Sequence, residues 1–349
     1  MMHSLADLAY AFRRQAGYCD VLGSPLWAQT MRQAADDIAA DGPIGRIVAG
    51  WPGDLHLGAL ALRFFGGLHY LALAGHAPSL AAQLPSTGGW PDADLWQALL
   101  AAVADNVDLL KHAIESPPQT NEVGRSAVLL GGFLRIAARI RLPLRLREIG
   151  SSAGLNQCWD RFFYELGPYR WSGQNPSLTI AVDWQGAAPD LNASVTVADR
   201  RGCDLRPIDL TNPDARLWLQ AYVWPDQAAR LAMLRGAIAT ALAMGIHIEK
   251  ASAATWLARE LADRPTGQTT VIYHSVVLQY FGEAERATFL AALAQAGAAA
   301  TYETPIAWLR LEHDALMDDF SLRLTLWPGG EETLLALAHP HGRSVGWRG

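Results

Sequence analysis

The first part of the chain places apolar side chains at helical spacing. Three stretches show this pattern over several turns: SPLWAQTMRQAADDIAA, DADLWQALLAAVADNVDLLKHAI and EVGRSAVLLGGFLRIAARI. Loops that bear proline and glycine, such as GWPGD and LPSTGGWPD, separate them. Ser24 before Pro25 is a good helix start, because serine caps free amides and proline fits the first helical turn. We therefore predict an all-helical N-terminal domain over residues 1–138.

The pattern changes near residue 142, where short β-branched runs begin to alternate with helical ones. The predicted helices include SAGLNQCWDRFFYEL and EAERATFLAALAQAG, and the predicted strands include LPLRLREIG, SLTIAVDW, ASVTVADRRGCD, IHIEKAS, TTVIYHSVV and FSLRLTLW. After the WPGG turn, ETLLALAH forms a hairpin with the last of these strands. We predict an α/β domain over residues 139–349, with a mostly parallel sheet and one antiparallel strand in a C-terminal hairpin. An extra hairpin is expected at about 165–195.

Composition supports a globular protein with a large core. Half of the 349 residues are hydrophobic, 18% are charged, and the net charge of −6 argues against a dedicated nucleic-acid surface. The most apolar stretch, AVLLGGFLRIAARI, contains Arg135 and is too short to span a bilayer. The N-terminus lacks the pattern of a signal peptide. We expect a cytoplasmic protein without a membrane partner, and the sequence leaves its oligomeric state open.

Neither cysteines nor arginines indicate a site. The three cysteines are widely separated and form no C-x-x-C pair, so no structural metal or disulfide framework is expected. Four arginines cluster in the sequence, and we interpret them as the solvated side of a helix end and the following strand: Arg139, Arg141, Arg145 and Arg147.

The stretch REIGSSAGLN, residues 147–156, carries the strongest functional signal. It places Glu148 at the end of a buried strand and small residues in the turn, among them Gly150 and Gly154. In an open α/β sheet, ligands bind beyond the carboxyl ends of the strands, and the following helix start offers free amides. A ligand-binding loop is therefore predicted here, extending to Asn156. Close packing of helix on strand is the alternative reason for small residues.

A second acid is needed to accept hydrogen bonds from ribose hydroxyls. Asp183 ends SLTIAVDW, and Asp204 lies in GCDLRP. We favour Asp204, because a glycine precedes it and a proline turns the chain shortly after. The inserted hairpin would account for its long separation from Glu148.

Residues 142–349 resemble class I S-adenosylmethionine-dependent methyltransferases. EIGSSAG resembles their first motif and GCDLRP their ribose-binding turn. The whole chain resembles a bacterial family named domain of unknown function 2332, through motifs that include QTNEVGRSAVLL, DRFFY, VWPDQAARL, YHSVVLQY and HPHG. The resemblance implies a Rossmann-like fold and S-adenosylmethionine as cofactor. Two positions depart from the pattern: Ser152 replaces the central glycine, and Ser252 stands where an acid commonly contacts adenine.

In these methyltransferases the methyl acceptor lies beside the end of the fourth strand, which corresponds to TTVIYHSVVLQYF in this chain. His274 and Ser275 end that strand, and Tyr280 follows. A histidine titrates near neutral pH, so His274 is a candidate proton acceptor. The alternative is a structural histidine that holds the strand end.

Two further motifs of the C-terminal domain contain candidate side chains. The HPHG turn, His339–Gly342, is expected to be structural, because the last strand should point away from the cofactor. Trp224 is a candidate substrate contact in VWPDQAARL, a motif that we interpret mainly as a helix start.

A polar turn precedes a strongly apolar helix and has two interpretations. Asn121, Glu122 and Arg125 either cap that helix or close the pocket over a small acceptor. The leading function is thus a methyltransferase acting on a small molecule. The alternative is a non-catalytic protein that binds a ligand or partner with the same fold. A nicotinamide-dependent enzyme is the weakest hypothesis, because Ser152 obstructs a pyrophosphate.

Overall fold

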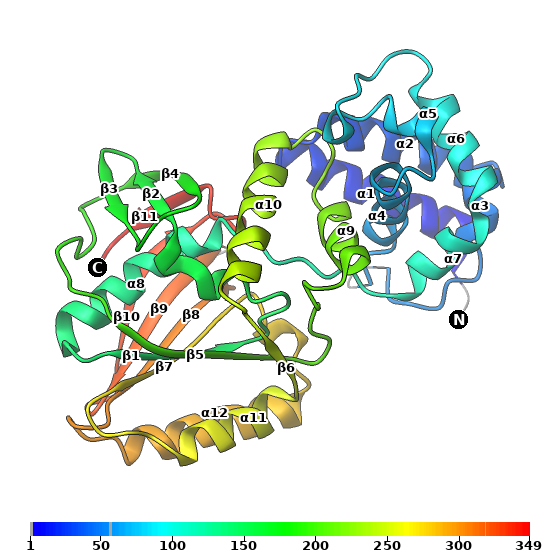
Figure 1. Ribbon diagram of the computed structural model, residues 1–349. Helices are drawn as coiled ribbons and strands as arrows, with labels where there is room; N and C mark the ends of the chain where they lie inside the picture. The colour runs from blue at the N-terminus through cyan, green and yellow to red at the C-terminus, as the bar shows by residue number, and fades with distance from the viewer. Residues whose placement is uncertain (1–2, 56–57, 318) are drawn as a thin grey trace. The chain divides into compact units, whose positions relative to one another are not determined.

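The computed structural model describes residues 3–55, 58–317 and 319–349 (Figure 1). The chain divides into two compact units, and each is described by itself. The helical unit comprises Met1–Thr120 and Asn212–Arg235. The sheet unit comprises Asn121–Thr211 and Gly236–Gly349.

The described residues of the helical unit contain helices and loops. Its elements are α1 (Leu5–Val21), α2 (Pro25–Ala39), α3 (Pro43–Val48), α4 (Leu60–Leu73), α5 (Pro78–Ala81), η1 (Pro85–Thr87), α6 (Leu95–Asp105), α7 (Val107–Glu115), α9 (Pro213–Ala221) and the first part of α10 (Ala228–Ala243). Ser4 starts α1 with a capping box to Asp7. Pro25 stands in the first turn of α2, although the Ser24 side chain makes no capping hydrogen bond.

Two side chains of α4 hold α9 within this unit. The Tyr70 hydroxyl donates to Asp214, and its ring stacks on Trp218 with centroids 4.2 Å apart. The buried His69 bonds the Ala221 carbonyl through Nδ1 at 3.0 Å. Burial lowers the pKa of His69 to about 4, so this imidazole is neutral at physiological pH.

One 11-stranded sheet forms the centre of the other unit, in the order β3-β2-β4-β11-β10-β9-β8-β7-β1-β5-β6. Its strands are β1 (Leu144–Ile149), β2 (Phe163–Leu166), β3 (Tyr169–Ser172), β4 (Thr179–Gln185), β5 (Val197–Asp204), β6 (Ile248–Lys250), β7 (Thr269–Ser275), β8 (Ile306–Asp314), β9 (Asp319–Trp327), β10 (Glu331–Ala338) and β11 (Ser344–Trp347). The mixed α/β class and the largely parallel sheet are confirmed.

The strand directions differ from the expected pattern with one antiparallel strand. Strands β8, β7, β1, β5 and β6 pair in parallel. Strand β9 is antiparallel to both β8 and β10, and β10 is antiparallel to β11. The physical reason lies in two tight turns. Gly329 and Gly330 have positive φ after β9, as has Gly342 after β10, so no crossover helix intervenes.

The helix predicted over residues 152–166 is wrong beyond residue 161. A short 3-10 helix, η2 (Leu155–Arg161), is followed directly by β2. Burial alternates along β2, with Tyr164 and Leu166 inside. This period of two belongs to a strand, and β2 pairs with β3 in an antiparallel hairpin and with β4 in parallel.

Helices cover the two faces of the parallel strands (Figure 1). Helix α8 (Arg125–Ile140) lies on one face, and α11 (Ala253–Ala262) and α12 (Glu283–Ala298) lie on the other. The core under α11 and α12 includes Ile149, Ile272 and Phe289. Among the described residues, no helix combines the length and hydropathy needed to cross a membrane.

The prediction that the arginine cluster is solvated is wrong for two of its members. Arg147 is fully buried, and Arg145 is 7% exposed. Both side chains bond the buried Glu260 of α11, Arg147 through Nε at 2.6 Å and Arg145 through Nη2 at 3.2 Å. A partner on another element, which sequence spacing does not reveal, makes their burial possible.

Candidate functional site

The candidate site lies where the strand order of the sheet reverses. Strands β5 and β6 lie on one side of β1, and the later strands β7 and β8 lie on its other side. Ligands of open α/β sheets bind at such a switch point, beyond the carboxyl ends of the strands. We call this end of the strands the carboxyl edge.

A tight loop of small residues follows β1 at the carboxyl edge. Gly150, Ser152 and Gly154 all have positive φ, of 65°, 52° and 74°. Ser152 is not a glycine, so its left-handed backbone is a strained conformation of the kind that gathers at functional sites. A side chain at Gly150 would overlap Val277, and one at Gly154 would press on Ile248. The loop is therefore packed closely from both sides.

Asp204, at the end of β5, is tied to this loop. Its Oδ2 accepts a hydrogen bond from the Ser152 amide at 2.9 Å, and its Oδ1 accepts one from the Arg206 amide at 2.8 Å. Asp183, the other candidate acid, lies on β4, which pairs with β11 far along the sheet from β1. Of the two acids, the structure brings Asp204 alone to the loop.

Glu148 is a buried carboxyl group behind the loop. It is 4% exposed, and burial raises its pKa to about 8, although the nearby Gln157 and Ser151 side chains act in the opposite direction. Within the described part of the chain, Glu148 forms no ion pair, and its Oε2 has no hydrogen-bond partner. At neutral pH this group is therefore mainly protonated and can donate a hydrogen bond.

Other buried polar atoms near Glu148 also lack a hydrogen-bond partner among the described residues. They are Ser152 Oγ, Asn156 Oδ1, Gln157 Nε2 and the Tyr273 hydroxyl. Tyr273 is the neighbour of Glu148 in the β1–β7 register. A side chain at Gly202 would overlap Gln157 and Ser151, so a glycine lets these side chains lie against β5. Buried groups of this kind are rare in native proteins and point to a site that takes a ligand or ordered water.

His274 is buried on the opposite face of the sheet, with both ring nitrogens engaged. Nδ1 lies 2.6 Å from Glu312 Oε1, and the Trp308 indole donates to Nε2 at 3.0 Å. This arrangement places the proton of the neutral ring on Nδ1. The same Glu312 oxygen accepts from the Val277 amide at 2.9 Å, so it also shapes the loop after β7. His274 thus holds the strand end in this geometry.

The remaining predicted residues of this region have other surroundings. Ser252 starts α11 and donates to Glu285 of α12 at 2.9 Å, while the adjacent Ala251 amide bonds the Asp204 carbonyl. Ser275 is half-buried at the end of β7, and Tyr280 is 75% exposed. Trp224 is buried in the hydrophobic core of the helical unit.

The start of α8 connects three segments of the carboxyl edge. Asn121 Oδ1 accepts from the Leu155 amide at 2.9 Å. Arg125 donates through Nε to the Pro340 carbonyl at 2.8 Å and through Nη1 to the Ser275 carbonyl at 3.4 Å. Glu122 is buried beside them. These contacts bring the loop after β1, the end of β7 and the HPHG turn together.

The expectation that the HPHG turn points away from the cofactor side is therefore wrong. It assumed that the preceding strand is antiparallel to β1. Because β10 is antiparallel to β9, and β9 is antiparallel to β8, β10 runs in the same direction as β1. The turn that follows it reaches the carboxyl edge.

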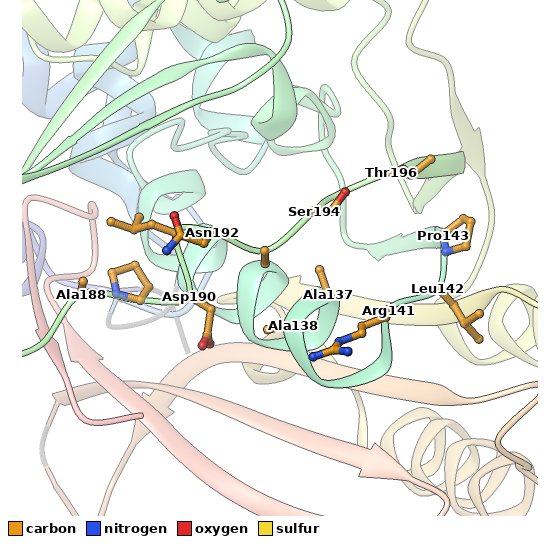
Figure 2. A pocket seen from close by; sticks show the side chains of 13 residues that line it. Ala137, Ala138, Arg141, Leu142, Pro143, Ala188, Asp190, Asn192, Ser194 and Thr196 are labelled. Atoms are coloured by element: carbon orange, nitrogen blue, oxygen red, sulfur yellow. The ribbon is translucent and has the colours of Figure 1, made fainter.

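A separate hollow of about 830 Å³ lies at the other end of β1 (Figure 2). Arg141 from the end of α8 and Asp190, Asn192 and Ser194 from the loop before β5 line it. These residues lie at the amino edge of the parallel strands. The hollow is distinct from the predicted site.

Sequence reasoning missed Glu312, Gln157 and Tyr273. Gln157 follows directly on the predicted loop, so its position was a usable signal. Glu312 lies in a strand that had no motif, and its role depends on the β7–β8 pairing. Among the described residues, no group of three or more histidine, cysteine or acidic side chains is arranged to hold a metal ion.

Comparison with known proteins identifies one family. Residues 9–347 match the family described as an uncharacterized protein conserved in bacteria, DUF2332. Neither the curated proteins nor the solved structures gave a match.

Proposed function

The chain belongs to the bacterial DUF2332 family, and we propose that it binds S-adenosylmethionine at the carboxyl edge and transfers its methyl group to a small acceptor. The observation that carries the proposal is the contact between Asp204 and the strained Ser152 amide at the switch point. It places an acid beside a tight loop where adenosyl ligands of open α/β sheets bind.

The residues at this edge fit such a ligand. Asp204 is half-buried and keeps lone pairs that can accept from ribose hydroxyls. Ser252 and its partner Glu285 offer polar contacts for the adenine amino group. The unpartnered Glu148 and Asn156 oxygens lie behind the loop. When bound, the sulfonium group supplies an electrophilic methyl carbon.

The proposed acceptor is small because several segments crowd this edge. Val277 lies over Gly150, Asn121 binds the loop at Leu155, and Arg125 spans two further segments. A crowded edge favours a small acceptor over a large polymer.

The binding proposal is tested by calorimetric titration with S-adenosylhomocysteine. Replacing Asp204 with alanine should weaken binding by about 1–3 kcal/mol, since a charged hydrogen-bond acceptor is lost. Asp183→Ala is the matched control, because Asp183 is an acid on a distant strand of the same sheet. A larger loss from Asp183→Ala, or no binding by the unmodified protein, contradicts the proposal.

A non-catalytic binding protein is the second candidate, and one observation favours it. The amides of Ser151, Ser152, Gly154 and Leu155 already donate to acceptors within the protein. A ligand would find few free donors in this loop. Production of S-adenosylhomocysteine with a broad panel of small acceptors separates the two functions. Binding without turnover across that panel supports the second.

A further inference from the structure

The HPHG turn is fixed to the start of α8 by contacts between backbones. A side chain at Gly342 would overlap the Gly124 carbonyl, and one at Gly124 would overlap the His341 carbonyl. Arg125 then bonds the Pro340 carbonyl at 2.8 Å. Because both glycines are needed for this approach, the turn has a defined place on the carboxyl edge.

The same arginine brings the turn towards the end of β7. Arg125 Nη1 donates to the Ser275 carbonyl at 3.4 Å, while Nε holds Pro340. One guanidinium group is only a few ångströms wide, so the two carbonyls lie close together. Ser275 ends the strand beside which the proposed methyl acceptor would lie. The two histidines of the turn are therefore placed on the acceptor side.

The two imidazoles are arranged differently from each other. His339 Nδ1 accepts from the His341 amide at 3.0 Å, so the neutral His339 ring carries its proton on Nε2. The rings meet edge to face, with centroids 5.4 Å apart and planes inclined by 73°. Both residues are half-buried, so part of each is accessible to a ligand or water. His274, in contrast, is fully buried with both nitrogens engaged.

From this geometry we infer that His341 takes the proton of the methyl acceptor and that His339 positions it. The inference rests on the proposed methyltransferase function. The acceptor is then a hydroxyl, amine or thiol that has a proton to lose. Its heteroatom forms a bond to the methyl carbon, the carbon–sulfur bond breaks with its electrons on sulfur, and the acceptor's proton passes to the imidazole of His341. Arg125 bonds the Pro340 carbonyl of this turn, the His339 ring meets the His341 ring, and the buried Glu122 lies beside Gly124.

The test is an NMR titration of the histidine ring signals in the full chain. Spectra are recorded over the neutral pH range, with and without S-adenosylhomocysteine. We expect the His341 ring signal to move over this pH range and to shift when the ligand binds. His112, an exposed residue of α7 in the helical unit, is the control and should be unaffected by the ligand.

Two variants separate a proton-accepting role from a structural one. His339→Asn keeps an acceptor oxygen near the position of Nδ1, so the turn should stay intact and ligand affinity should remain within about twofold. His341→Gln should also bind S-adenosylhomocysteine, but methyl transfer to a panel of hydroxyl, amine and thiol acceptors should fall at least tenfold and lose its pH dependence near neutrality. His112→Gln is the matched control for transfer, because His112 is an exposed residue of α7.

The outcomes of this test are distinct. If the unmodified protein does not bind S-adenosylhomocysteine, the proposed function fails, and the inference fails with it. If the ligand binds but the His339 and His341 signals neither move nor titrate, only the inference is overturned. Transfer by His341→Gln at the rate and pH dependence of the unmodified protein also overturns it.

Discussion

The two faces of β1 hold buried ionisable side chains in opposite ways. Towards α11, the fully buried Arg147 bonds Glu260 and Asp199, each at 2.6 Å, and Arg145 adds a second contact to Glu260. Towards α8, Glu148 is almost as buried, yet the described residues provide it with no ion pair and leave one oxygen unbonded. A paired charge holds elements together, whereas an unpaired one changes its pKa and is available for chemistry.

The largest effect is expected from breaking the paired face. Arg147→Met should lower the free energy of unfolding by roughly 3–5 kcal/mol, because Glu260 would lose its main buried partner. Arg201→Met is the control, since Arg201 is 61% exposed and its ion pairs should contribute less than about 1 kcal/mol. Denaturant titration measures both. Equal losses of stability from the two variants would show that burial does not make the ion pairs of Arg147 more stabilising than those of Arg201.

The unpaired Glu148 should make the free energy of unfolding depend on pH. The pKa of Glu148 in the folded state is about 8, against an ordinary value of 4.5. Between these two pKa values, the folded protein keeps a proton on Glu148 that the unfolded chain releases. The contribution of Glu148 to the free energy of unfolding is therefore complete below pH 4.5 and decreases as the pH rises to about 8. The loss is about 1.4 kcal/mol per pH unit, or roughly 2–3 kcal/mol between about pH 6 and 8.

Replacing Glu148 with glutamine isolates this contribution. The variant should lack the fall in stability, so the difference in unfolding free energy between the two proteins should change steadily with pH. Thermal or denaturant unfolding at several pH values measures it. A difference that stays constant from acidic to mildly alkaline pH would show that Glu148 is ionised in the folded protein.

His274 extends the comparison, because it is buried and fully paired without belonging to the arginine network. His274→Ala should lower stability by about 1–3 kcal/mol, since Glu312 and Trp308 would each lose a hydrogen-bond partner. Affinity for S-adenosylhomocysteine should change less than for Asp204→Ala. If His274→Ala kept its stability but lost methyl transfer, His274 rather than His341 would be the proton acceptor.

The smallest effect is expected at Tyr273. Its hydroxyl is buried without a hydrogen-bond partner among the described residues, so Tyr273→Phe should change stability by less than about 1 kcal/mol. A loss of several kcal/mol in the same unfolding experiment would mean that ordered water already satisfies this hydroxyl.

Sequence patterns predicted the strands of the sheet unit better than the way they are joined. Runs such as TTVIYHSVV carry the β-branched signal within themselves, and β7 lies where it was predicted. The direction of β10 depends on two tight turns and on its pairing with β9, so a general expectation about the last strand led to the wrong place for the HPHG turn. Likewise, DRFFYEL contains helical and strand spacing in a few residues, and pairing with β3 and β4 decides in favour of the strand.

The candidate site shows the same limit. The proximity of Asp204 to the loop after β1 follows from two parallel neighbouring strands, so the motif sufficed to propose it. The engagement of His274 by Glu312 and the burial of Arg147 against Glu260 depend on side chains that lie far away in sequence. No local pattern reports such a partner, and the protonation and exposure of a residue depend on it.

The contact between Arg125 and the Pro340 carbonyl joins positions 215 residues apart. During synthesis, the loop after β1 and the start of α8 leave the ribosome long before the HPHG turn exists. Contacts of such long range form slowly, because a long loop must close before they contribute. The carboxyl edge can therefore be completed only when nearly the whole chain has been made. Chains cut short before the last strands would keep the loop after β1 but lack the HPHG turn, which our inference places on the acceptor side, so the inferred proton acceptor would be absent from them.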